Sequence, residues 1–220
     1  ASIGQVHRAV LADGREVAVK VQYPNIGAAI RGDLDNTEML SMMFSAVAFR
    51  NLDVHALIDE LRDRMTDELD YRLEATCQTE FADRYRDHPF IHVPAVLPHL
   101  STGRVLTSEL VIGASWRDAL GWDQEQRDLA GEGLFRFVFR SLYRVNAFNG
   151  DPHPGNYLFQ PGGRVTFLDF GLVKHFTQPE IDLFGDMIRA LVMEGDTARY
   201  RQIIERIGLL RPGTPVSDAQ

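Results

Sequence analysis

One short loop holds two polar side chains with the spacing needed for phosphoryl transfer. Residues 151–156 read Asp-Pro-His-Pro-Gly-Asn, so an aspartate is followed five positions later by an asparagine. In a D-x-x-x-x-N loop the aspartate orients an attacking hydroxyl or accepts its proton, and the asparagine oxygen reaches a metal ion on the phosphates. Asp151 is therefore a candidate catalytic residue and Asn156 a candidate metal ligand. The same pattern also fits a plain Asx-turn loop.

A second candidate metal ligand follows one predicted hairpin later. Residues 168–171 read Leu-Asp-Phe-Gly, after two short predicted strands at 157–159 and 165–168. An aspartate at a strand end followed by Phe and Gly is a D-F-G element, whose carboxylate holds Mg²⁺ on the phosphates. The order of loop, hairpin and D-F-G favours one site over two unrelated turns, and it assigns Asp169 to the metal.

Lysine is rare in this chain, which makes its position informative. Only Lys20 and Lys174 occur among 23 basic residues. Residues 17–20 read Val-Ala-Val-Lys, which matches the V-A-I-K strand whose lysine contacts the α- and β-phosphates. We therefore place Lys20 among the catalytic residues and, with Ala18, in the ATP site. An exposed strand lysine is the alternative, and Lys174 receives no role.

The first residues of the chain align with a phosphate-binding loop. Counted back from the lysine, Gly4 and Val6 fall where G-x-G-x-x-G-x-V has its last glycine and its valine. Ala1 stands in place of the second glycine, and its methyl group narrows the approach of the backbone to the phosphates. Ala1, Ser2, Gly4 and Val6 are thus candidate cofactor-binding residues.

Lys20 needs an acidic partner on a helix, and the candidates lie within residues 67–74. At about 100° per residue Asp70 and Glu74 share a helical face, whereas Glu68 and Glu74 point about 120° apart. We therefore assign Glu74 to Lys20 as a catalytic residue and leave Glu68 and Asp70 for another role. The long separation between Lys20 and Glu74 predicts a helical insertion at about 25–60.

The composition narrows the class of protein. The 220 residues are 45% apolar and 25% charged, which is typical of a globular protein. A net charge of −8 argues against nucleic acid as a partner. The single cysteine, Cys77, excludes an internal disulfide and a Cys-rich zinc module. Because we find no apolar run of membrane-spanning length and no signal peptide, we expect a cytoplasmic location or one peripheral to the inner membrane.

The predicted elements form an α+β, bilobal protein-kinase-like fold. Strands come first, at 5–11 and 16–21 around an Asp-Gly turn, and helical patterns dominate after a strand at 104–112. We expect an N-terminal lobe over 1–111, with a β-sheet, the inserted helices and an αC-like helix ending at about 76. A helical C-terminal lobe over 112–220 would carry the catalytic loop and D-F-G.

The segment that joins the two predicted lobes is a candidate hinge. Residues 107–111 read Thr-Ser-Glu-Leu-Val, and their backbone groups are expected to contact adenine. Glu109 and Val111 are therefore added to the candidate cofactor-binding residues.

Together these motifs resemble the UbiB (AarF-type) family of atypical kinase-like proteins. The resemblance rests on the segments Ala-Ser-Ile-Gly-Gln-Val-His (1–7), Val-Ala-Val-Lys-Val-Gln-Tyr-Pro (17–24), Glu-Leu-Asp-Tyr with Glu-Ala (68–75), Asp-Pro-His-Pro-Gly-Asn (151–156) and Leu-Asp-Phe-Gly (168–171). It implies ATP (or ADP) and Mg²⁺ as cofactors and a kinase or ATPase that supports isoprenoid-quinone (ubiquinone-like) or related lipid metabolism.

Further expectations come from this resemblance alone. Glu68 and Asp70 would form the family's E-x-D element, which faces a K-x-G-Q helix over the active site. The chain opens without Met, and we expect it to be a piece that lacks that N-terminal helix. The family usually has His where this chain has Asn149.

Two other functions remain open. A phosphotransferase of the aminoglycoside or choline type shares the Gly-Asp-x-x-x-x-Asn of 150–156, although the Ala-rich start and the acidic cluster at 68–74 favour the UbiB reading. The third hypothesis is a scaffold that binds a nucleotide without turning it over. The intact motifs argue against it. No A-P-E element follows residue 171, so ATPase activity or small-molecule phosphotransfer is favoured over protein phosphorylation.

The expected partners are a nucleotide and, through the resemblance, a lipid or membrane surface and lipid-biosynthetic proteins. A stripe of arginines recurs every fourth residue at Arg136, Arg140 and Arg144. Such a stripe fits a solvated helix face or a contact with anionic lipid.

Overall fold

The computed structural model describes residues 3–29, 32, 69–211 and 213–214. Contacts divide the chain into two compact units, one of residues 1–138 and 149–173 and the other of residues 139–148 and 174–220. All the candidate site residues belong to the first unit. This division does not follow the predicted lobes, whose boundary after residue 111 stays a prediction.

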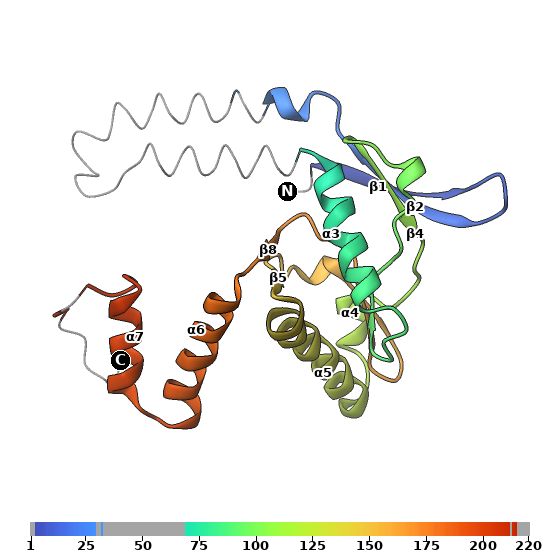
Figure 1. The fold of residues 1–220 in the computed structure, drawn as a ribbon. Coiled ribbons are helices and arrows are strands. Elements are labelled where there is room, and N and C mark those ends of the chain that lie inside the picture. Colours follow the sequence, from blue (N-terminus) through green and yellow to red (C-terminus); the bar gives the residue numbers. More distant parts are fainter. Residues whose placement is uncertain (1–2, 30–31, 33–68, 212, 215–220) are drawn as a thin grey trace. The chain divides into compact units, whose positions relative to one another are not determined.

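A three-stranded antiparallel sheet carries the lysine (Figure 1). Its strands, in the order β1-β2-β4, are Gly4–Val10, Glu16–Gln22 and Val105–Glu109. The predicted Asp-Gly turn joins β1 to β2, and Gly14 adopts the positive φ of +85° that such a turn requires. Lys20 lies in the central strand, opposite Val6 on one side and Leu106 on the other.

Helix α3 (Tyr71–Arg84) packs beside this sheet (Figure 1). It extends beyond the predicted end at about residue 76, because neither Gly nor Pro interrupts residues 77–84 and Phe81 is fully buried. Its buried face consists of Tyr71, Glu74, Gln78 and Phe81. Of the helical insertion predicted at about 25–60, residues 26–29 are helical, and 30–31 and 33–60 lie outside the described residues.

The buried face of this helix is not wholly apolar. Leu73, although apolar, is 48% exposed. Two polar residues, Glu74 and Gln78, occupy the buried face instead, and the Gln78 Nε2 donates to the carbonyl of Pro94 at 2.7 Å. A pattern that counts only apolar residues cannot recognise a buried face built partly from polar ones.

A second sheet positions the D-F-G element. Its order is β3-β7-β6, with bounds Ile91–His92, Arg164–Phe167 and Tyr157–Gln160. The predicted hairpin of β6 and β7 is present, and Gly162 and Gly163 in its turn have φ of +85° and +82°. Helix α4 (Trp116–Ala119) and all but the last two residues of α5 (Gln124–Arg140) belong to the same unit.

The helical pattern expected after residue 112 is interrupted before residue 147. After α5 the chain forms a π-helical turn at Ser141–Val145, and Asn146 adopts a left-handed conformation with φ of 55°. Strand β5 (Ala147–Asn149) follows and pairs with β8 (Val173–His175), a strand that lies where we predicted helix. Asparagine tolerates the left-handed region better than most residues, which explains the break at this position.

The second unit is mainly helical. It contains α6 (Gln178–Ile188), a π-helical turn at Arg189–Met193 and α7 (Thr197–Arg206). Within the described part of the chain, no helix combines the length and the apolar character that crossing a membrane requires.

Candidate active site

Lys20 lies between two carboxylates. Its Nζ is 2.7 and 2.8 Å from the two carboxylate oxygens of Glu74 and 3.2 Å from Oδ2 of Asp169. The Glu74 side chain is only 5% exposed and that of Lys20 18%. Burial alone lowers the pKa of Lys20, but the charges of Glu74 and Asp169 outweigh it and raise that pKa above its ordinary value. Lys20 is therefore held as a fixed cation.

Tyr71 completes the surroundings of Lys20, and the sequence reasoning missed it. The lysine Nζ lies 5.1 Å from the centroid of the Tyr71 ring. Burial is the main reason that the pKa of Tyr71 rises to about 12. Its hydroxyl is buried and has no hydrogen-bond partner among the described residues. The available signal was its position three residues before Glu74, which places both on one face of α3.

Two features fix the position of Asp169: a hydrogen bond to its own carboxylate and the burial of the next residue, Phe170. The Asp169 Oδ1 accepts a hydrogen bond from the main-chain N–H of Gly171 at 2.9 Å. Phe170 is 1% exposed, and its ring centroid lies 4.9 Å from that of Phe81 and 6.4 Å from that of Phe137. The buried ring anchors the D-F-G segment while the Asp169 carboxylate faces Lys20.

The loop at 151–156 brings the other two motif residues together. The Asn156 Nδ2 donates to Asp151 Oδ2 at 2.8 Å, so the amide oxygen of Asn156 points away from that carboxylate. The main-chain N–H of Leu168 donates to the Asn156 carbonyl at 3.0 Å, which ties the loop to the residue before Asp169. The His153 Nδ1 accepts from Gly155 N at 3.0 Å, so this side chain stabilises the turn of the loop.

Asn149 contacts both of these segments. Its Nδ2 donates to the main-chain carbonyl of Asp169 at 2.6 Å, and its Oδ1 accepts from the main-chain N–H of Asp151 at 3.2 Å. The sequence marked this position only as a departure from the UbiB pattern and assigned it no role.

The candidate phosphate loop is described only in part, because Ala1 and Ser2 lie outside the described residues. A Cβ atom on Gly4 would lie 2.5 Å from the Tyr71 hydroxyl and 2.5 Å from the carbonyl oxygen of Val21. Packing therefore requires glycine at this position. Val6 and Ala18 lie on the same face of the sheet as Lys20, because Val6 is directly opposite the lysine and Ala18 two residues before it.

The candidate hinge shows contacts that the sequence did not predict. The main-chain N–H of Glu109 donates to the carbonyl of Ala95 at 2.8 Å, so this amide is already bonded within the protein. The Glu109 Oε2 lies 3.5 Å from Nε2 of His92, whose pKa burial lowers. Val111 follows β4 and is partly buried.

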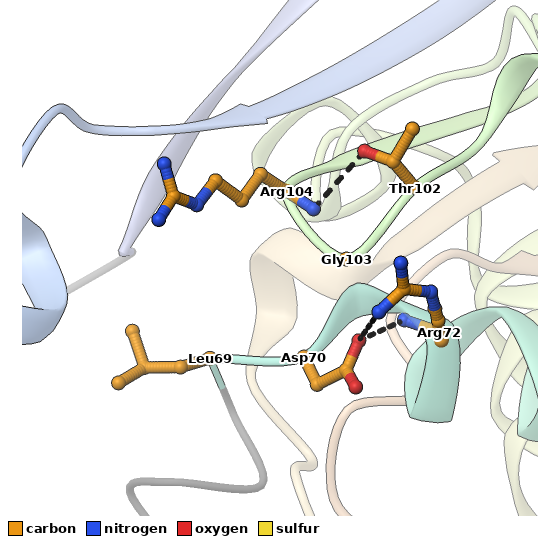
Figure 2. Close-up of a pocket in the computed structure, with 6 residues that line it drawn as sticks. All are labelled: Leu69, Asp70, Arg72, Thr102, Gly103 and Arg104. Atoms are coloured by element: carbon orange, nitrogen blue, oxygen red, sulfur yellow. Dashed lines mark hydrogen bonds and ion pairs between the residues drawn. The ribbon is translucent and has the colours of Figure 1, made fainter.

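Asp70 caps α3 rather than sharing a helical face with Glu74. It has an extended backbone conformation, and its Oδ1 accepts from the main-chain N–H of Arg72 at 3.0 Å. Figure 2 shows this carboxylate beside Arg72, at the rim of a pocket that does not include Lys20. The pocket is lined by Leu69, Asp70, Arg72, Thr102, Gly103 and Arg104. Glu68 lies outside the described residues.

The donor groups at the site suit Mg²⁺ that is bound together with phosphates. Among the described residues, no three His, Cys, Asp or Glu side chains gather into a metal site. Asp169 and Asn156 provide a carboxylate and an amide oxygen, which are ligands that Mg²⁺ accepts. Since Mg²⁺ usually takes its remaining ligands from water and substrate phosphates, two protein ligands are sufficient.

These elements define a kinase-like fold of the α+β class. A solved structure from Mycobacterium tuberculosis, whose title describes a complex of Rv3197 with erythromycin, superposes with a TM-score of 0.80. The two sequences are 37% identical, and the match covers 99% of this chain and 55% of the Rv3197 chain. The family model of the ABC1 atypical kinase-like domain matches residues 1–204, and the chain belongs to this family.

Curated relatives support this assignment. Atypical kinase COQ8B, mitochondrial, from Rattus norvegicus is 36% identical over 92% of this chain and 38% of its own length. Protein ACTIVITY OF BC1 COMPLEX KINASE 1, chloroplastic, from Arabidopsis thaliana is 34% identical over 99% of this chain and 32% of its own length. The chain thus spans about a third of the length of these relatives.

Proposed function

We propose that this domain binds ATP with Mg²⁺ and acts as an atypical kinase or ATPase of the UbiB type. The observation that carries the proposal is the position of Lys20 between Glu74 and Asp169. A compact ammonium held by two carboxylates suits a phosphate contact, because it supplies a fixed positive charge beside the proposed metal ligand.

The remaining residues have distinct proposed roles. Asp169 and Asn156 would hold Mg²⁺, which when bound neutralises negative charge on the phosphates. Asp151 would orient the attacking hydroxyl or water and accept its proton, with its carboxylate held by the Asn156 amide. The face of the sheet that carries Val6 and Ala18 would cover the nucleotide, and backbone groups of the segment around Glu109 and Val111 would contact adenine.

We further propose that the activity supports isoprenoid-quinone or related lipid metabolism, which rests on membership of the family. That membership favours this reading over a phosphotransferase of the aminoglycoside or choline type. Of the arginine stripe, Arg136 forms an ion pair with Glu132 on the exposed side of α5, which fits a solvated face. A location in the cytoplasm or at the periphery of the inner membrane stays a prediction.

Calorimetric titration with ATP, with and without Mg²⁺, tests the proposal on the protein and on Asp169→Asn. We expect Mg²⁺ to strengthen ATP binding in the wild type, and the asparagine variant to lose most of that gain while melting at a similar temperature. Equal Mg²⁺-dependent affinity in both would contradict the metal assignment. Mg²⁺-dependent binding without any ATP turnover would favour the non-catalytic scaffold.

A further inference from the structure

The Asn149 side chain bonds to the two segments that carry the proposed base and the proposed metal ligand. Its amide nitrogen donates to the Asp169 carbonyl at 2.6 Å, and its amide oxygen accepts from the Asp151 N–H at 3.2 Å. Because the amide group is planar, these two bonds set the separation of the two main-chain segments.

Two main-chain bonds join the same segments, but they lie on either side of Asp169. Gly150 N donates to the Leu172 carbonyl at 2.8 Å, and Leu168 N donates to the Asn156 carbonyl at 3.0 Å. The Asn149 bond reaches the peptide unit of Asp169 itself. The side chain therefore acts on the residue whose carboxylate must face the metal.

We infer that Asn149 is a positioning residue that couples Asp151 to Asp169, an inference that rests on the proposed function. With the amide removed, the Asp169 carbonyl loses its hydrogen bond to the catalytic loop, while Lys20 still attracts the Asp169 carboxylate. The Mg²⁺-dependent part of ATP binding should then weaken, and ATP binding without Mg²⁺ should change little.

Three substitutions separate the two bonds. Asn149→Ala removes both of them. Asn149→Ser keeps a hydroxyl that can accept from the N–H two residues on, but it is one atom too short to reach Asp169. Asn149→His offers both groups again, since the His153 Nδ1 already accepts from the N–H two residues on at 3.0 Å and the opposite ring nitrogen can donate.

The matched control is Gln126→Ala. The Gln126 Oε1 accepts a hydrogen bond from the main-chain N–H of Gly162 at 2.8 Å, so this variant also removes a contact between a side chain and a distant main-chain group. Gln126 lies on α5 and has no part in the proposed site.

Hydrogen exchange at the Asp151 amide and calorimetric ATP titration with and without Mg²⁺ provide the two measurements. In Asn149→Ala we expect the Asp151 amide to exchange about fivefold faster. We also expect the increase in ATP affinity caused by Mg²⁺ to be about fivefold smaller. Each factor corresponds to the loss of one net hydrogen bond. Asn149→Ser should keep near-normal exchange but lose the same gain, Asn149→His should restore both, and Gln126→Ala should change neither.

The outcomes distinguish this inference from the proposed function. A wild-type gain from Mg²⁺ that survives in Asn149→Ala and Asn149→Ser overturns the positioning role alone. An equal loss in Gln126→Ala also overturns it, because the effect would then be general destabilisation. If the wild type shows no gain from Mg²⁺, the proposed function fails, and the positioning role fails with it.

Discussion

The ring of Phe170 packs against that of Phe81, with centroids 4.9 Å apart. Phe81 lies seven residues after Glu74 in α3, so the two side chains share a helical face. The helix that pairs with Lys20 through Glu74 therefore also holds the residue next to Asp169. The Lys20–Glu74 pair and the position of Asp169 depend on one packed helix.

We predict that Phe81→Ala weakens Mg²⁺-dependent ATP binding as well as stability. Removing a buried phenylalanine costs about 3–5 kcal/mol, and here the cavity would lie beneath Phe170. Thermal unfolding and calorimetric titration measure the two effects. If the alanine variant fails to fold, the same two measurements are made on the milder variant Phe81→Leu.

Phe135→Ala is the control for this prediction, because Phe135 is 63% exposed on α5 and its loss should change both quantities little. If Phe81→Leu lowers the melting temperature but leaves the Mg²⁺-dependent affinity unchanged, α3 does not position Asp169.

The sequence motifs identified the residues proposed to carry the chemistry, but they did not identify the residues that support them. Lys20, Asp151, Asn156 and Asp169 could be found because each stands in a short pattern that reflects one local geometry. The surroundings could not be found in this way, because burial depends on what packs against a helix or strand. Leu73 looks like a core residue but is 48% exposed, and the polar Glu74 is buried.

Asn149 and Tyr71 illustrate a second limit. The hydrogen bond from Asn149 joins residues 20 positions apart, and the contact of Tyr71 with Lys20 joins a helix to a strand. The Asn149 bond does not follow from the spacing of residues along the chain, and for Tyr71 the spacing shows only that it shares a face of α3 with Glu74. Only the packing of α3 and the D-F-G segment in three dimensions brings these groups together.

Gly4→Ala should lower both stability and nucleotide affinity. A Cβ atom here would lie 2.5 Å from the Tyr71 hydroxyl and from the Val21 carbonyl oxygen, and the latter belongs to the backbone of β2 and cannot turn away. The start of β1 would have to shift off the sheet. Thermal unfolding and ATP titration measure the change.

Gly131→Ala serves as the comparison for that substitution. Gly131 lies in α5 with no neighbouring atom within 4 Å of an added Cβ, so alanine should stabilise the helix by about 1 kcal/mol. A Gly4→Ala variant as stable as Gly131→Ala would disprove the steric requirement at Gly4.

Two substitutions of Asp70 separate the effect of its capping hydrogen bond from the effect of its negative charge. Asp70→Ala should lower the free energy of unfolding by about 1 kcal/mol, because the N–H of Arg72 loses its acceptor at the start of α3. Asp70→Asn should lose much less, since asparagine caps helices equally well. Chemical denaturation compares the two variants. Equal losses would mean that the negative charge of Asp70, and not the cap, supports this end of the helix.

The last prediction concerns Lys20 and Glu74 as a unit. With the Glu74 side chain 5% exposed, Lys20→Met takes the ammonium away from a buried carboxylate, and Glu74→Gln leaves Lys20 with Asp169 as its acidic neighbour. Breaking a buried ion pair from one side typically costs about 3–5 kcal/mol. Lys20→Met and Glu74→Gln should therefore each lower the melting temperature and weaken Mg²⁺-dependent ATP binding. The double variant should lose much less than the two single losses combined, because the Lys20–Glu74 interaction can be lost only once.

Lys20→Arg is the companion variant, because it keeps the charge but replaces a compact ammonium with a planar fork. It should retain most of the stability and still reduce ATP turnover sharply. Thermal unfolding, calorimetric titration and an ATPase assay on the wild type, the two single variants and the double variant complete the double-mutant cycle, and the same measurements are made on Lys20→Arg. Strict additivity of the losses in Lys20→Met and Glu74→Gln would show that the two residues act independently, in spite of the 2.7 Å between Nζ and Oε1.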